Sequence, residues 1–135
     1  MRRGLFALPV PVLVLLVYNA VVLLGGAPAA TLPTVVLHAS LVSGAAFTLT
    51  TGELLLLMGV VALFIEIVKA TRSSMASAVD HALSALVFAV YLVEFLLVKA
   101  AGTGVFLVLT IMSFLDLIAG FTVTLGTARR DLIIH

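Results

Sequence analysis

Long apolar runs dominate this chain. They extend from about Leu5 to Leu24, Glu53 to Val68, His81 to Val98 and Val105 to Leu125. A helix rises about 1.5 Å per residue, so roughly 17–25 apolar residues cross a hydrocarbon layer of ~30 Å. Three of the runs have that length, and the second reaches it when the two residues before it are included. Because lipid-exposed backbone must pair within its own segment, each run is predicted to be a helix.

The stretch between the first two runs decides the number of crossings. Residues 32–50 are nearly long enough for a fifth span. With four spans and a cytoplasmic N-terminus, every Lys and Arg except Lys99 lies inside, whereas five spans place three inside and four outside. The positive-inside rule favours four spans. We therefore expect an all-α integral membrane protein, a four-transmembrane-helix bundle with both termini in the cytoplasm.

The four helices are expected to belong to one membrane domain that covers residues 1–135. Their expected bounds are about 5–24, 53–70, 80–99 and 104–127, with an outer loop over 25–52. The first helix has an alternative interpretation as a signal peptide, because Arg2 and Arg3 precede it and Ala27-Pro28-Ala29 resembles a cleavage site. Its apolar stretch is longer than the usual ~7–15 residues, which favours a retained helix.

The outer loop changes to a period of two. Beyond Pro33, apolar and polar residues alternate in two short runs that flank Ser43-Gly44. Alternation on both sides of a turn signal predicts an extracytoplasmic β-hairpin over residues 35–50. The alternative is an irregular loop that lies on the outer headgroups.

A hairpin at this place needs a neighbour. Two strands alone are marginally stable in water, and their edges carry unpaired backbone donors and acceptors. Pairing with the same hairpin of another copy is the simplest solution. It predicts a homo-oligomer, or attachment to a larger membrane complex, through residues 35–50.

Composition agrees with the membrane assignment. Of the 135 residues, 64% are hydrophobic and 10% are charged, too few charges for a soluble domain. The net charge of +1 argues against nucleic acid as a partner. Without cysteine, the chain forms no disulfide and no thiolate metal site.

Four polar residues are expected in one layer of the membrane interior. Counted from the cytoplasmic helix ends at ~1.5 Å per residue, they lie about 16 to 22 Å deep. They are Asn19, Tyr91, Glu94 and Asp116. Two interpretations stay open: the acids join helices by hydrogen bonds to Asn and Tyr, or Glu94 and Asp116 form a proton or cation pathway.

Small and polar residues at helical spacing predict the helix-packing faces. These positions are Gly59, Ser84, Ser113, Gly120 and Thr124. Two interfacial ion pairs are also expected: Glu53 with Lys99 near the outer surface, and Glu66 with Lys69 near the inner one.

No catalytic constellation accompanies these residues. The histidines fall in the outer loop, at the start of the third helix and at the C-terminus, so none activates a serine inside the membrane. Haem, metal and phosphate motifs are missing, and no cofactor is expected. Small size and richness in Ala, Val and Leu suggest a bacterial inner-membrane protein. We expect it to be non-enzymatic, and self-associating or an accessory subunit; the alternative is a proton- or cation-conducting channel or transporter.

Overall fold

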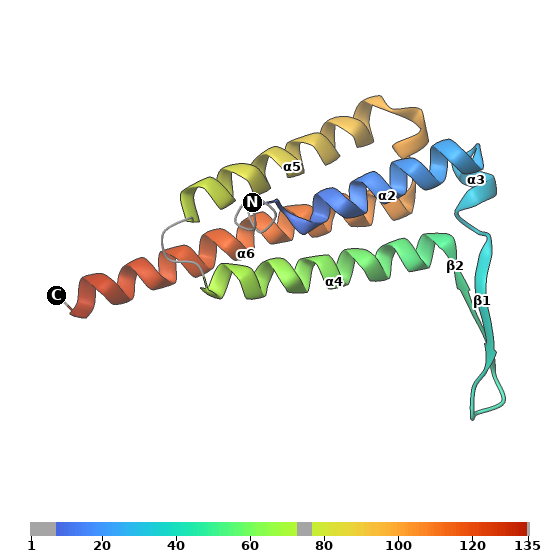
Figure 1. The fold of residues 1–135 in the computed structure, drawn as a ribbon, viewed down its shortest axis with the longest axis horizontal. Coiled ribbons are helices and arrows are strands. Elements are labelled where there is room, and N and C mark those ends of the chain that lie inside the picture. The colour runs from blue at the N-terminus through green and yellow to red at the C-terminus, as the bar shows by residue number, and fades with distance from the viewer. Residues whose placement is uncertain (1–7, 73–76, 135) are drawn as a thin grey trace.

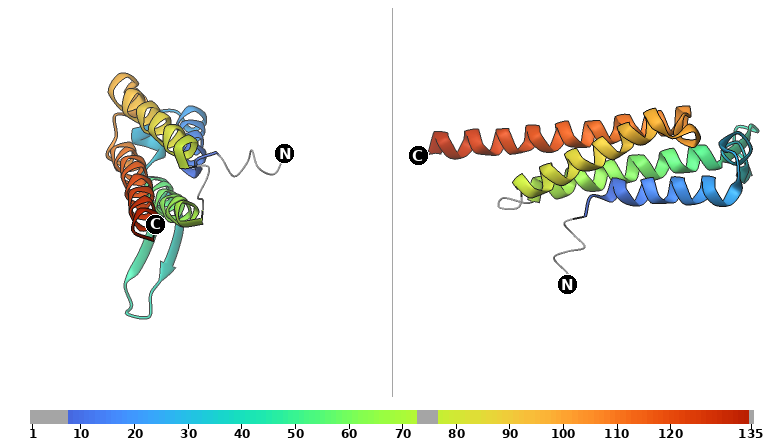
Figure 2. Two further views of the ribbon diagram at one scale, coloured as in Figure 1. Left: turned by 90° about the vertical axis from the view of Figure 1, so that its left-hand side faces the viewer. Right: turned by 90° about the horizontal axis from the view of Figure 1, so that it is seen from above.

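The computed structural model describes residues 8–72 and 77–134. In chain order its elements are α2 (Val10–Gly25), α3 (Pro28–Thr31), β1 (Val35–Ser40), β2 (Ala46–Thr50), α4 (Thr51–Arg72), α5 (Ser77–Leu97), the 3₁₀ turn η1 (Lys99–Ala101) and α6 (Gly104–Ile134). The four long helices run side by side, and the hairpin projects sideways from one end of the bundle (Figures 1 and 2). We call this end the hairpin end; α2 begins, and α4 and α6 finish, toward the opposite end (Figure 1).

Three helices are long and apolar enough to cross a membrane. Their candidate spans are Thr51–Thr71, Val79–Leu97 and Gly104–Val123, with mean hydropathies of 2.2, 1.7 and 2.2. Only 22%, 17% and 33% of these windows are buried inside the protein, so most of their apolar surface faces outward. The fourth long helix, α2, is also apolar but has 16 residues, or about 24 Å at the usual rise.

Helix bounds differ from the expected ones where local chemistry decides them. Leu8 and Pro9 are not helical and α2 begins at Val10, later than expected, because Pro9 occupies its N-cap with an extended backbone. In contrast, α6 continues past residue 127 to Ile134, since the last eight residues of the chain contain no Gly or Pro. Lys99, expected at the end of the third helix, lies in η1.

Phe106 is the centre of the core near the hairpin end. Its side chain is fully buried, and its ring contacts those of Tyr18 (centroids 4.9 Å apart), Tyr91 (5.4 Å) and Phe95 (6.5 Å). These rings come from α2, α5 and α6, so one aromatic cluster joins three helices. The helix pairs α4–α6 and α5–α6 make the most extensive contacts, while α2 packs mainly on α4.

The predicted hairpin is confirmed. β1 and β2 pair antiparallel, with Leu37 opposite Leu49 and Ala39 opposite Phe47, and an irregularity in register follows Val35. The turn closes with a bond from the Gly44 amide to the Leu41 carbonyl (2.9 Å), and Gly44 has φ +85°. A positive φ at this position favours glycine, which explains why the weaker Ser-Gly signal suffices. Because residues 35–40 and 46–50 are strands, this segment is not a fifth helix.

Candidate functional site

The hairpin has one apolar and one polar face. Residues opposite each other across an antiparallel pair place their side chains on the same face. The apolar face therefore carries Leu37, Ala39, Leu41, Phe47 and Leu49. The other face, which we call the polar face, carries His38, Ser40 and Thr48 together with the small Ala46. Most of these side chains are exposed, on both faces. The hairpin is thus amphipathic, and within residues 8–72 and 77–134 its main contact with the bundle is where β2 meets α4.

The backbone groups of the two edges are available for pairing. The Leu41 amide donates to the Ala45 carbonyl (2.9 Å), so the alternation of an antiparallel ladder points the amides of His38 and Ser40 away from β2. The sequence has no Asp, Glu, Lys or Arg between Arg3 and Glu53. Charged side chains are a common protection of edge strands, and neither strand has one.

The base of the hairpin is tied to the bundle. The amides of Thr51 and Gly52 donate to the carbonyls of Thr34 (2.8 Å) and Leu32 (2.9 Å). Glu53 Oε2 accepts bonds from the Thr50 amide (2.9 Å) and hydroxyl (3.0 Å), and the Glu53 amide donates to Thr50 Oγ1 (3.3 Å). This reciprocal capping box starts α4 directly after β2, so the two elements share a rigid corner.

Glu53 is accordingly not paired with Lys99, which corrects the outer ion pair expected above. Within residues 8–72 and 77–134, the ion pair that the structure contains is Lys69 Nζ to Glu66 Oε1, at 3.0 Å. The Glu53 carboxylate instead caps the start of α4, because the Thr50 amide three residues before it is within its reach.

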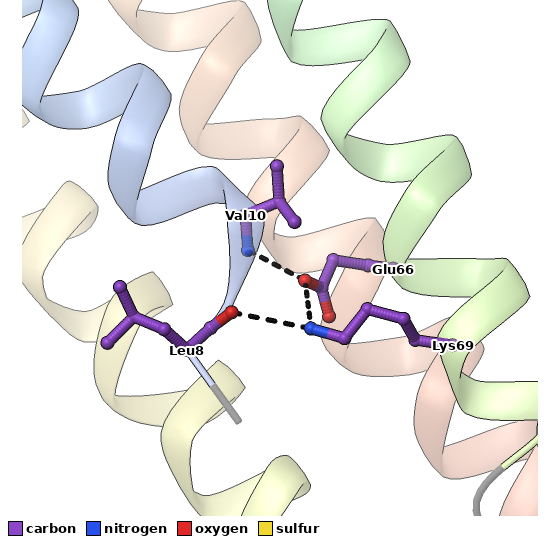
Figure 3. Close-up of polar contacts among 4 residues, drawn as sticks. All are labelled: Leu8, Val10, Glu66 and Lys69. Carbon is purple, nitrogen blue, oxygen red and sulfur yellow. Dashed lines mark hydrogen bonds and ion pairs between the residues drawn. The ribbon is translucent and has the colours of Figure 1, made fainter. Parts of the chain in front are cut away.

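The Glu66–Lys69 pair holds the start of α2 (Figure 3). Glu66 Oε1 accepts a bond from the Val10 amide (2.7 Å), and Lys69 Nζ donates to the Leu8 carbonyl (3.3 Å). The Val12 amide bonds to the carbonyl of Pro9 (3.1 Å), and Pro11 has no amide hydrogen. Every backbone amide in the first three positions of α2 therefore has a hydrogen-bond acceptor, although the helix begins beside α4 rather than at the end of the bundle (Figure 1).

Asp116 belongs to the same region. It is 6% exposed, and the Ser84 hydroxyl of α5 lies close enough to its carboxyl group to interact with it. Glu66 and Lys69 of α4 are the charges that act on it. A buried polar cluster of α4, α5 and α6 therefore lies toward the opposite end of the bundle.

The expected layer of four polar residues is not one connected set. Tyr91 donates to the Pro11 carbonyl (2.7 Å), and Asn19 donates to the Leu15 carbonyl of its own helix (3.0 Å). Glu94 is half-buried and lines an open groove on α5, with apolar neighbours, while Asp116 lies in the cluster described above. Within the described residues, the hydrogen bonds of Tyr91 and Asn19 go to backbone carbonyls, although the Glu94 charge acts on Tyr91 three residues before it.

Two of the expected packing positions, Gly59 and Gly120, lie close to a neighbouring helix. A Cβ at Gly59 would be 2.6 Å from Leu109 Cδ2, and one at Gly120 would be 3.0 Å from His81 Cε1. Ser84 and Ser113 are buried, and the Ser113 hydroxyl has no hydrogen-bond partner among the residues that the structure describes. Thr124 lies in α6, and its side chain is outside the described part of the structure.

Tyr18 is a structural residue that the sequence reasoning missed. Its side chain is fully buried, and its hydroxyl bonds to the Ala100 carbonyl (2.9 Å) and to Thr103 Oγ1 (2.8 Å). It therefore joins α2 to the turn between α5 and α6. The signal was the spacing of Val14, Tyr18 and Val22, which places the three on one face of a helix.

Comparisons with known proteins identify no relative. No protein-family model, no curated protein and no solved structure matches the chain. The geometry of the hairpin and of the buried cluster is therefore the basis for a functional proposal.

Proposed function

We propose that this chain is a small non-enzymatic protein of the bacterial inner membrane that associates with itself through its hairpin. The observation that supports the proposal is an exposed, uncharged pair of strands whose edges are free and whose base is fixed to the bundle. Only another strand offers donors and acceptors at the spacing of such an edge. Service as an accessory subunit of a larger membrane complex would use the same edge.

In this proposal α2 crosses the membrane together with the three longer helices. The hairpin end lies outside, and both termini lie in the cytoplasm. Lys69, Arg72, Arg129 and Arg130 then fall at the inner side, as the positive-inside rule favours. The short α2 is accommodated because Glu66 and Lys69 satisfy the backbone where it begins, below the membrane surface.

The direction of the hairpin favours a two-fold partner. Copies of one protein insert with the same orientation, so an axis that relates two of them runs along the helices. The strands lie across this direction, side by side when viewed along the bundle (Figure 2). A half-turn about such an axis therefore brings one strand antiparallel to its copy. We assign this pairing to β1, since the Thr50 amide of β2 is already bound by Glu53.

A matched pair of proline variants tests this assignment. His38 and Thr48 are opposite each other in the ladder, and both amides point outward. His38→Pro removes a donor from the free edge of β1, and Thr48→Pro does the same for β2, without breaking a bond inside the hairpin. We expect the mass measured in nanodiscs to fall from dimer to monomer for His38→Pro only, with His38→Thr as the control for the lost imidazole.

The result for the unchanged protein decides between the proposals. A monomer in both native membranes and nanodiscs would overturn self-association. A stable assembly with other proteins, lost on His38→Pro, would instead support the accessory-subunit proposal.

Ion conduction by Glu94 and Asp116 has weaker support. The two carboxyl groups lie in different surroundings, one on a groove of α5 and the other in the buried cluster. Flux into proteoliposomes that is lost in a folded Glu94→Gln, Asp116→Asn variant would favour conduction over the structural role.

A further inference from the structure

The apolar face of the hairpin is turned toward the helices. Phe47 and Leu49 line an open groove of about 370 Å³ together with Leu56, Leu57 and Val60 of α4. Because α4 runs along the bundle while the hairpin projects sideways from its end, a groove lined by both elements lies in the corner between them (Figure 1). The apolar face therefore looks along the bundle, and the polar face looks away from it.

This corner is continuous with the outward surface of α4. Leu57 and Val60 are 52% and 51% exposed and belong to the candidate span Thr51–Thr71. An apolar side chain exposed within a span meets acyl chains. The hairpin extends over the space beside that surface, at the height where α4 begins (Figures 1 and 2).

We propose that the apolar face of the hairpin is a lipid-binding surface that lies on the outer leaflet, with acyl chains of that leaflet in the corner groove. The inference rests on the proposed crossing of the membrane by α4, and it does not require self-association. The lipid contact would be a second contact of the hairpin, because pairing at the edge of β1 covers neither of its two faces.

The chemistry of the corner favours lipid as the occupant. Its lining is apolar except for Glu53, whose carboxylate is engaged by Thr50. Acyl chains cover apolar side chains and require no hydrogen bonds in return. On the other face, His38, Ser40 and Thr48 would meet water and headgroups. This division between faces is that of an amphipathic element at a membrane surface.

The absence of tryptophan from the chain allows a direct test. Phe47→Trp places a single fluorophore on the apolar face of the hairpin. Thr48→Trp, one residue further along β2, places it on the polar face. Each variant is reconstituted in vesicles of phosphatidylethanolamine and phosphatidylglycerol. Quenching is measured with phospholipids brominated near the top of the acyl chains, and with iodide in the outer solution.

We expect brominated lipid to quench Phe47→Trp severalfold more strongly than Thr48→Trp, and iodide to show the reverse order. Leu37→Trp, on the apolar face of β1, should behave like Phe47→Trp and guards against a local effect of one substitution. Circular dichroism and gel filtration confirm that each variant is folded.

Two outcomes would overturn the inference. Equal quenching of the two faces by lipid would show that the hairpin does not lie flat. Shielding of Phe47→Trp from both quenchers would show that protein, such as a second copy, fills the corner. A monomeric protein with a lipid-quenched Phe47→Trp would remove the proposed self-association and support the lipid contact alone.

Discussion

At the scale of single residues, buried polar groups differ in whether they have partners. Glu66 is 9% exposed and accepts hydrogen bonds from two donors, the Val10 amide and the Lys69 ammonium. The Ser84 hydroxyl lies beside the Asp116 carboxyl group, whereas the Ser113 hydroxyl is buried without a partner among the described residues. Substitutions at these positions should therefore have unequal effects.

Removal of the Glu66 carboxylate should weaken the attachment of α2. Glu66→Leu leaves the Val10 amide without its acceptor and the Lys69 ammonium with the Leu8 carbonyl but no counter-charge, at an expected cost of about 1–3 kcal/mol. Glu66→Gln keeps an acceptor oxygen and should lose less. Thermal unfolding in detergent measures the difference, and hydrogen exchange at the Val10 amide locates it. Equal stability of Glu66→Leu and the unchanged protein would contradict this role.

The two buried serines provide an internal comparison. Ser84→Ala removes a hydroxyl beside the Asp116 carboxyl group, and we expect a loss of about 1–3 kcal/mol because that buried group loses a polar neighbour. Ser113→Ala removes a hydroxyl that has no partner, so we expect unchanged or slightly higher stability. Melting temperatures of the two variants under identical conditions test this order. The opposite order would show that Ser113 has a partner that this structure does not contain.

At the scale of helices, glycine sets how closely α4 approaches α6. A Cβ at Gly59 would lie 2.6 Å from Leu109 Cδ2 and 2.7 Å from Met112 Sδ. In a membrane, where packing rather than water drives helix association, such close approach is a main source of stability. Sequence spacing predicted the position of Gly59, but its neighbours on α6 follow from the relative height of the two helices.

Gly59→Val should therefore crowd the ends of the Leu109 and Met112 side chains on α6. We expect a loss of about 1–3 kcal/mol from overpacking, seen as a lower melting temperature. Gly126→Val is the matched control, since a Cβ there has no atom within 4 Å. Similar effects of the two substitutions would indicate that helix propensity, rather than contact with α6, determines the result.

At the scale of the whole molecule, the order of the long helices determines which segments lie at each end of the bundle. The hairpin and η1 lie at one end of the bundle, and the C-terminus lies at the other (Figure 1). If the helices cross the membrane, residues at the two ends face different compartments. The chain has no cysteine, so single introduced thiols report their side without background.

Labelling from outside tests this arrangement. In intact cells or spheroplasts, an impermeant maleimide should label Ser43→Cys, at the tip of the hairpin, before permeabilisation. It should label Arg129→Cys, near the end of α6, only afterwards, because the bilayer separates the two positions. Labelling of both residues before permeabilisation would refute the even number of crossings.

Local patterns in the sequence determined the elements of this protein. Apolar length predicted the helices, period-two alternation predicted the hairpin, and charge placement excluded a fifth span. These features depend on neighbours along the chain and on the solvent around it, so no tertiary contact is needed to infer them. The start of α2 after Pro9 and the extension of α6 to Ile134 also follow from local sequence, since proline limits where a helix can begin and the last residues of α6 include no Gly or Pro.

Tertiary structure alone decided which polar groups meet. Asn19, Tyr91, Glu94 and Asp116 lie at similar depths by residue count, yet each has different surroundings, because the rotation of a helix about its axis is set by packing. The attachment of Glu66 to the start of α2 and the direction of the hairpin likewise involve segments far apart in the chain. Contacts between distant segments depend on how whole helices fit together, and residue spacing does not contain that information.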